Sequence, residues 1–428
     1  MKNRQWSKIF KACIFFGLLA MGISARASDW PQWRGLERDG HVPADAQVPV
    51  SVSTEPKVDW KLQIGGGFSS PVVAGGKLVY LDAQDGKEIA HMLDAKTGKE
   101  IWRATLTDSF EDEWGPGPRS TPIMDGDRVY TQSCNGEFRC LNAADGKVIW
   151  GTSFAKDFGV TFLGGKANEG TASRRGNNGC GVIDGEHIIL PVGSKAGASA
   201  VCFDKRNGKV LWKTGNDEAA YSSLLVENFA GTKQIIYFTS EALMGMGADD
   251  GRILWRVPLR TDAKRHAMTP VIFGDTISVN SQTIGLVCFK ITKEGDAFKA
   301  ERSWTDKDLK INLATPVLVD HYLYCQGAGK NYVCVDALNG KKMWDQEGFG
   351  DKVSVSIVMG KNILVTTDKG DLFFIAANPE KYTELAHTQV CGKSWSSPAY
   401  ADGKLFVREG LDRGWKITCF DLMAGNRE

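Results

Sequence analysis

The chain has 428 residues, a length that two or three ordinary domains would fill unless an internal repeat accounts for it. Its 52 Lys and Arg residues are balanced by 51 Asp and Glu residues, so no overall basic field would attract DNA, RNA or an anionic membrane. We therefore expect no nucleic-acid partner.

Residues 1–27 have the pattern of a secretory signal peptide. A basic stretch over residues 1–11 precedes an apolar run over residues 12–23, and Ala25-Arg26-Ala27 is a small-x-small cleavage site. We predict cleavage after Ala27, export to the periplasm or the exterior, and a mature chain without a membrane span. A retained N-terminal anchor is the alternative, although the run is short for a bilayer.

An N-terminal extension over residues 28–56 is followed by a short alternating segment. Val58–Leu62 contains Trp60 and is typical of an outer strand, yet no sequence for three accompanying strands precedes it.

One nine-residue phrase then recurs with fixed internal spacing. A glycine supplies the positive φ of a tight turn, and a tryptophan four residues later begins the next strand with a large apolar surface. The five copies are Asp94–Trp102, Asn142–Trp150, Asp204–Trp212, Gly247–Trp255 and Asp336–Trp344.

Alternating stretches with turn residues precede each phrase, so each unit has four strands over about 40 residues, the period of propeller blades. Eight units can be counted. Their first strands begin at Ser69, Ser120, Asn178, Ser222, Met268, Ala314, Ser354 and Ser396. In unit five, Trp304 follows an insertion at residues 293–300, and in unit seven Leu385 stands in place of the tryptophan.

The last unit ends before its fourth strand, and Val58–Leu62 has the sequence of that missing strand. Pairing the two would protect the open edge of the last blade. The sequence therefore predicts an all-β, eight-bladed propeller of four-stranded antiparallel blades, closed by an N-terminal outer strand. Residues 57–428 would form this single domain.

Five of the ten cysteines share one position of the repeat, two residues before the phrase begins. Such positions in different blades lie too far apart for disulfides, so these cysteines are expected to be buried thiols. A local exception is suggested by the nine-residue spacing of Cys325 and Cys334 across a hairpin. If they face each other, they would form a disulfide.

The residues that open the inner strands are small and polar. They would line the mouth of the central channel, either to hold water or a polar ligand or because small residues fit where eight strands converge. The predicted channel-mouth residues are Ser70, Thr121, Ser223, Thr269, Thr315 and Ser397.

Several links between blades are long and emerge on one face, where a rigid scaffold usually carries its binding residues. The alternative is a solvated rim without a ligand. The candidate binding residues are Trp114, Arg119, Arg174, Arg175, His266 and Trp395. Stacking and ion pairing would suit a planar group with carboxylates, an acidic glycan or a peptide. Replacing Arg119 and Arg174 with alanine should weaken binding of such a ligand, with little change in stability if both side chains are exposed.

The recurring phrase resembles the tryptophan-docking motif of the quinoprotein alcohol dehydrogenase-like propellers, which have pyrroloquinoline-quinone (PQQ)-type repeats. The resemblance covers residues 57–428, and the opening Asp29–Gly35 is similar to the start of many secreted members. It implies that the motif tryptophans pack between neighbouring blades. These are Trp60, Trp102, Trp150, Trp212, Trp255 and Trp344.

The repeat is specific for the fold and occurs in both enzymes and non-enzymes. We predict a non-catalytic binding or scaffold protein, and the alternative is a PQQ-dependent dehydrogenase of alcohols or sugars. The resemblance implies a calcium-bound quinone for such enzymes, and the chain has neither their Cys-Cys dipeptide nor their calcium ligands on successive inner strands.

We accordingly predict no catalytic residue, no metal site and no cofactor, with PQQ and calcium reserved for the alternative. The expected partner is a small molecule, a glycan or a protein, and the protein is expected to be a monomer. A third possibility is a scaffold for outer-membrane protein assembly, although that relative is a lipoprotein and this chain has no lipid-attachment signal.

Overall fold

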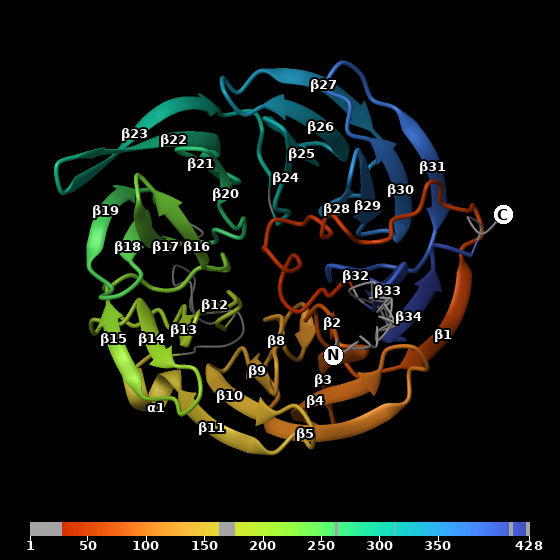
Figure 1. Cartoon of the computed structure of the whole chain (residues 1–428), viewed down its shortest axis with the longest axis horizontal. Coiled ribbons are helices and arrows are strands. Elements are labelled where there is room, and N and C mark those ends of the chain that lie inside the picture. The colour runs from red at the N-terminus through yellow and green to blue at the C-terminus, as the bar shows by residue number, and fades with distance from the viewer. Residues whose placement is uncertain (1–27, 162–175, 262–263, 312, 411–413, 425–428) are drawn as a thin grey trace, which may run out of the picture.

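Eight blades form a closed ring around a central channel in the computed structural model (Figure 1). The structure describes residues 28–161, 176–261, 264–311, 313–410 and 414–424. The predicted signal peptide lies outside the described residues. No helix within the described ranges is long and apolar enough to cross a membrane.

Each blade is a four-stranded antiparallel sheet whose first strand faces the channel. The strands of blades one to four are β2 (Val72–Ala74), β3 (Lys77–Gln84), β4 (Lys87–Asp94) and β5 (Glu100–Asp108); β8 (Ile123–Asp125), β9 (Arg128–Gln132), β10 (Glu137–Asn142) and β11 (Val148–Ser153); β12 (Val182–Asp184), β13 (His187–Leu190), β14 (Ala200–Asp204) and β15 (Val210–Thr214); and β16 (Leu225–Phe229), β17 (Thr232–Phe238), β18 (Ala242–Gly247) and β19 (Ile253–Pro258).

Blades five to eight have the same order of strands, except that blade eight takes its outer strand from the beginning of the chain. Their strands are β20 (Val271–Phe273), β21 (Thr276–Ser281), β22 (Gly285–Glu294) and β23 (Ala297–Asp306); β24 (Val317–Val319), β25 (Tyr322–Gln326), β26 (Asn331–Asp336) and β27 (Lys342–Glu347); β28 (Ser354–Met359), β29 (Asn362–Thr367), β30 (Asp371–Ala376) and β31 (Glu384–Gln389); and β32 (Ala399–Ala401), β33 (Lys404–Glu409), β34 (Lys416–Asp421) and β1 (Lys57–Gln63). A small hairpin, β6 (Glu111–Asp112) and β7 (Gly115–Pro116), and a short helix, α1 (Phe154–Phe158), lie in the links between blades.

The ring closes as the sequence predicts. β1 pairs antiparallel with β34, and Trp60 lies opposite Cys419. The seam is reinforced by Arg408 of blade eight, whose guanidinium donates hydrogen bonds to the carbonyls of Ser69 at 3.0 Å and Leu81 at 2.6 Å. Arg408 is fully buried, so the last blade is tied to the first through the core as well as through the outer strand.

The docking tryptophans connect successive blades by a repeated contact. In six outer strands the indole Nε1–H donates to a backbone carbonyl of the next blade, at 2.8 to 3.2 Å. The donor and acceptor pairs are Trp60 and Ala95, Trp102 and Ala143, Trp150 and Lys205, Trp212 and Ala248, Trp304 and Ala337, and Trp344 and Asn378. The irregular fifth blade follows the rule, because its Trp304 docks on blade six.

Trp255 is the exception. Its Nε1–H donates to Oε1 of Gln234, a residue of its own blade, at 2.8 Å. The reason lies in blade five, where β22 and β23 form one long hairpin that does not contain the glycine turn of the other blades. Blade five therefore has no turn carbonyl in the place where Trp255 could donate the hydrogen bond that the other docking tryptophans make.

The motif glycine has a second role besides forming its turn. Gly208 has φ +73°, and a Cβ placed on it would lie 2.5 Å from the ring of Trp150 in the preceding blade. The same close approach occurs at Gly98, Gly146, Gly251 and Gly340, each against the tryptophan of the blade before it. The glycine thus lets two blades pack face to face around an indole ring.

Replacing Gly208 with alanine is expected to lower the free energy of unfolding by about 2 to 3 kcal/mol, because the left-handed backbone is strained and the methyl group collides with Trp150. Gly185 is the matched control: it has φ +57° but open space around its Cβ position. Gly185→Ala should cost only the backbone strain of about 1 kcal/mol. Urea unfolding of both variants measures the difference, and equal losses would show that the contact with Trp150 contributes nothing.

The outer strand of blade seven requires a correction. Every outer strand has a bulge beside the position that tryptophan occupies in the other blades. In blade two, Trp150 lies opposite the core position of the third strand. In blade seven that place is taken by Ala386, which faces Phe374. Leu385 is the bulged residue, and 48% of it is exposed. The turn before β31 is longer than the repeat predicts, which shifted the expected position by one residue.

The predicted disulfide between Cys325 and Cys334 is wrong. Cys325 pairs with Val333, while Cys334 pairs with Tyr324, so the two thiols lie on opposite faces of blade six. In this register, the residues facing the two cysteines are eight or ten positions away from them in the sequence, so a spacing of nine places the two cysteines on opposite faces of the sheet. Both cysteines are free and buried, as are the cysteines at the shared position in other blades, such as Cys140 and Cys202.

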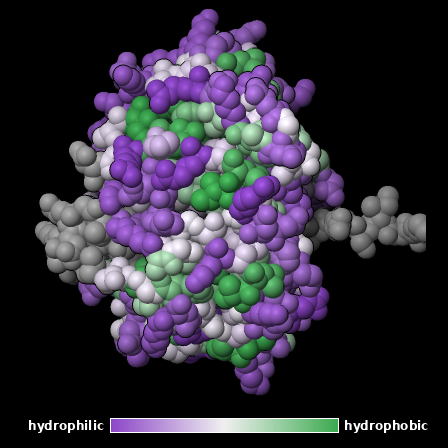
Figure 2. Space-filling view, turned by 90° about the vertical axis from the view of Figure 1, so that its left-hand side faces the viewer, coloured by the Kyte–Doolittle hydropathy of each residue, from purple (hydrophilic) through white to green (hydrophobic). Residues whose placement is uncertain are grey.

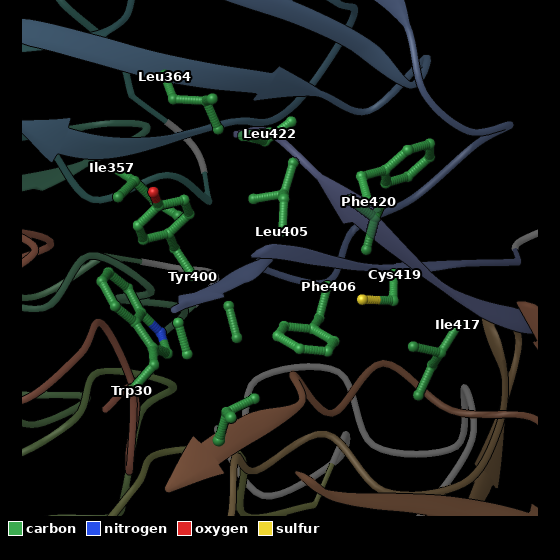
Figure 3. Close-up of a cluster of buried hydrophobic side chains, with 14 of the residues drawn as sticks. Trp30, Ile357, Leu364, Tyr400, Leu405, Phe406, Ile417, Cys419, Phe420 and Leu422 are labelled. Atoms are coloured by element: carbon green, nitrogen blue, oxygen red, sulfur yellow. The ribbon is translucent and has the colours of Figure 1, made fainter. Parts of the chain in front are cut away.

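The core is divided among the interfaces between blades. The largest cluster joins blades seven, eight and one to the N-terminal extension, and Figure 3 shows Trp30 beside Tyr400 and Ile357 within it. On the outer edge of the ring, exposed apolar residues such as Val210 and Leu211 of β15 lie in the outer strands. Figure 2 shows this side of the ring, where apolar patches are separated by hydrophilic side chains.

Candidate functional site

The N-terminal extension crosses the channel on the face that carries the short turns (Figure 1). Trp30 forms a bridge with Val73 in β2, with N–H to carbonyl distances of 2.7 and 2.9 Å. Further along, Gly40 accepts a hydrogen bond from the backbone N–H of Val358 in blade seven at 2.8 Å. The segment is thus hydrogen-bonded to blades one and seven, on either side of blade eight.

Two side chains of this segment form the floor of the channel. Trp33 donates its indole N–H to Oγ1 of Thr269 at 3.3 Å. Arg34 donates to the carbonyls of Thr315 and Pro316 at 2.9 and 2.7 Å, and to those of Arg38 and Asp39. From the sequence, Asp29–Gly35 could be recognised only by its resemblance to other secreted propellers. The extension lies outside the repeat, so the repeat does not predict where its side chains lie.

The predicted channel-mouth residues mainly join blades to one another. At several of these positions the backbone N–H donates a hydrogen bond to a side chain of the neighbouring blade: Ser397 N–H donates to Oγ of Ser70 at 3.0 Å, and Thr269 N–H donates to Oγ1 of Thr315 at 3.1 Å. Ser223 continues the pattern, and Cys180 takes part with its thiol. Small hydrogen-bonding side chains at these positions therefore hold the inner strands in a ring.

Above the floor lies a cavity of about 410 Å³, a size typical of small-ligand sites. The residues at the start of the inner strands form its walls, and the long links between blades form its mouth. The lining residues are Trp33, Arg34, Phe68, Ser70, Trp114, Arg119, Asn178, Cys180, Tyr221, Ser223, Arg265, Ala267, Leu313, Ala314, Thr315, Lys352, Val353, Val355, Trp395 and Ser397. Thr121 and Thr269 belong to the same ring of hydrogen bonds but do not line this cavity.

Aromatic rings gather at one side of the mouth. The ring centroids of Trp114 and Trp395 are 5.2 Å apart, and Phe68 lies 5.9 Å from Trp395. The ammonium of Lys352 lies 5.2 Å from the ring of Trp114 and 5.5 Å from that of Trp395. This cation–π contact holds a positive charge at the entrance of the cavity.

Arg119 lies under this aromatic group and is largely buried, so the condition of exposure set for its alanine variant is not met. Its guanidinium donates to both carboxylate oxygens of Asp112 in β6, at 2.5 and 2.9 Å, and is flanked by the rings of Phe68 and Phe110. Burial acts to lower the pKa of Arg119, but its electrostatic contacts with Cys134 and Asp112 outweigh burial and raise that pKa. Arg119 therefore holds the β6–β7 hairpin, which carries Trp114, against the ring.

Other predicted residues are not brought into the cavity. His266 is fully buried: it stacks on Phe238 with the ring centroids 4.1 Å apart, and its Nδ1 lies 2.7 Å from the carbonyl of Thr239. Burial lowers the pKa of His266 to about 4, so the ring is neutral at physiological pH. Its chain neighbours Arg265 and Ala267 line the cavity instead. Arg174 and Arg175 lie outside the described residues.

The lining residues do not fit a calcium-bound quinone. Calcium requires several oxygen ligands, with carboxylates foremost. Among the described residues that line the cavity none is Asp or Glu, and Asn178 provides the one side-chain amide. Nor do the described residues contain a group of three or more His, Cys, Asp or Glu placed to hold a metal ion elsewhere.

Comparison with known proteins agrees with the repeat. The family described as "Outer membrane protein assembly factor BamB" matches residues 86–346. A curated relative of that name from Shewanella oneidensis is 21% identical over 91% of this chain and 95% of its own. The chain resembles the crystal structure of BamB from Moraxella catarrhalis with a TM-score of 0.57, at 12% identity over 88% of this chain and 99% of that one.

The fold is shared equally by enzymes. The quinohemoprotein alcohol dehydrogenase ADHIIG from Pseudomonas putida HK5 superposes with a TM-score of 0.63, at 11% identity over 92% of this chain and 80% of that one. At such identities the structural likeness establishes the fold alone. The match of the family to most of the repeats goes further, and the chain belongs to the family of PQQ-repeat propellers described as outer membrane protein assembly factor BamB.

Proposed function

We propose that this protein is an exported, non-catalytic binding scaffold that receives a protein partner on the loop-bearing face, around the mouth of the central cavity. The observation that carries the proposal is the cluster of Trp114, Trp395 and Lys352 at that mouth. Tryptophan side chains are enriched where protein partners contribute most binding energy. Trp114 is 39% exposed although it is held by the β6–β7 hairpin.

The construction of the ring favours a scaffold. The inner-strand hydroxyls are engaged in hydrogen bonds between blades, and the N-terminal extension closes the other face. A rigid support of this type lets loops present a fixed surface at little entropic cost on binding. The relatives named as assembly factors also favour a role in contacts between proteins rather than in turnover of a substrate.

Export follows from the predicted cleavage after Ala27. Ser28 is then the first residue of the mature chain, and its backbone nitrogen lies 3.1 Å from Oδ1 of Asp402 in blade eight. In the mature chain this nitrogen would be an ammonium group, which pairs well with a carboxylate. Residues 28–56 would serve as the floor-forming extension and residues 57–428 as the propeller domain.

Site-specific photo-crosslinking in the cells that make the protein tests the proposed face. A photoreactive amino acid at position 114 or 352 should yield a discrete protein adduct, because both positions border the mouth. The control is position 361, an exposed lysine in the short turn between β28 and β29, which should give no such adduct. Adducts from position 361 and none from positions 114 and 352 would place the partner on the opposite face.

A further inference from the structure

The charged residues that line the cavity are all cationic. Among the described residues they are Arg34, Arg119, Arg265 and Lys352, and Arg119 is offset by Asp112. The other three form no salt bridge with any described carboxylate. Among the described residues, the cavity lining thus has an excess of positive charge, although Asp39 lies near enough to Arg34 to act on it electrostatically.

The positive charge at the floor of the cavity has the highest cost in free energy, because it is buried. Arg34 is 6% exposed, and its described hydrogen bonds all go to neutral backbone carbonyls. Behind it, Arg38 is 5% exposed and donates one hydrogen bond to the side chain of Gln32, while its Nε and Nη2 have no partner among the described atoms. Burial lowers the pKa of both guanidiniums to about 10. Buried charges of this type are stabilised by a counter-ion.

The remaining lining is apolar and aromatic. Trp33 forms part of the floor, and Phe68, Trp114 and Trp395 form one side of the entrance. Leu313, Val353 and Val355 add aliphatic surface. A ligand that matches the cavity therefore combines an apolar body with a negative charge.

We propose that the central cavity binds a small organic acid, with its apolar body against the tryptophans and its carboxylate neutralised by Arg34, Arg265 and Lys352. This proposal goes beyond the proposed scaffold role, although the two share Trp114, Trp395 and Lys352 at the mouth of the cavity, and its test requires no protein partner. The negative charge carries the specificity, because each cation that pairs with a carboxylate discriminates against a neutral analogue. The apolar body supplies affinity that charge does not affect.

Isothermal titration calorimetry of the mature protein with indole-3-acetate and its neutral isostere indole-3-acetamide tests this proposal. The acid should bind with a stoichiometry of one and at least tenfold more tightly than the amide. Raising the salt concentration should weaken binding of the acid and leave binding of the amide almost unchanged. Equal affinities, or no binding of either compound, would overturn the proposal.

Substitutions of the lining residues test which cations recognise the carboxylate. Lys352→Met and Arg265→Gln change partly exposed side chains and should each reduce the preference for the acid severalfold without weakening the amide. Lys361→Met, on the opposite face, is the matched control and should behave as the wild type. Trp395→Leu should weaken both compounds. If both cation variants retain the full preference, the carboxylate is not recognised in this cavity.

Discussion

A chain that lacks Val58–Leu62 is expected to lose more than about 5 kcal/mol of its free energy of unfolding, or to aggregate. Truncating one buried aromatic residue costs about 3 to 5 kcal/mol, and the deletion also removes the pairing of β1 with β34. The deletion also removes the hydrogen bond from Trp60 to Ala95 and the packing of Trp60 against Gly98 of blade one. The exposed edge of β34 would then invite pairing with other chains.

The measurement is thermal and urea unfolding followed by tryptophan fluorescence, with size-exclusion chromatography to detect aggregates. Trp60→Ala separates the indole from the strand and should account for about 3 to 5 kcal/mol. Lys61→Ala, on the exposed side of the same strand, is the control and should change little. A deletion variant that unfolds at the wild-type temperature would mean that the ring does not depend on this strand.

Replacing Arg408 with methionine is expected to lower the free energy of unfolding by about 3 kcal/mol. The guanidinium donates hydrogen bonds to the carbonyls of Ser69, Leu81 and Gly65. A buried carbonyl left without a hydrogen bond costs about 1 to 3 kcal/mol. Relief of the buried charge offsets part of this loss, since burial already lowers the pKa of Arg408 to about 10. Methionine keeps an apolar side chain of considerable length in the core, so the hydrogen bonds are the main difference.

Arg302→Met is the control for Arg408→Met, because Arg302 is exposed and lies over the ring of Phe289. It should change stability by less than about 1 kcal/mol. Proteolysis at the junction of blades eight and one provides a local readout: the Arg408 variant should be cleaved there before it is cleaved elsewhere. An unfolding midpoint equal to that of the control would remove Arg408 from the account of ring closure.

The repeat made most of the fold predictable, because the spacing of glycine and tryptophan reports a local turn and strand that the structure reproduces. The pairing of β1 with β34 also followed, since one strand was missing at one end and one was left over at the other. Errors arose where local spacing changed. Leu385 was misplaced by the longer turn before β31, and Cys325 and Cys334 were misjudged by one residue of register.

The candidate site was only partly predictable. Trp114 and Trp395 could be placed on the correct face because they lie in long links between blades, whereas Lys352 gave no signal as a single lysine in a short link. Arg34 belongs to a segment without repeat register, so its position under the channel depends on contacts far apart in the sequence. His266 shows the converse, since the link that contains it reaches the cavity but its ring turns into the core.

The central claim is that the propeller binds without catalysing. It is tested most directly by titrating the purified mature protein with pyrroloquinoline quinone in the presence and absence of Ca²⁺, in a calorimeter, and then assaying the mixture for reduction of a dye by alcohols and glucose. We expect calcium to leave the heat of quinone addition unchanged and the dye to stay oxidised, because no described lining residue is a carboxylate. Saturable binding that requires calcium, together with dye reduction, would contradict this account and identify a dehydrogenase.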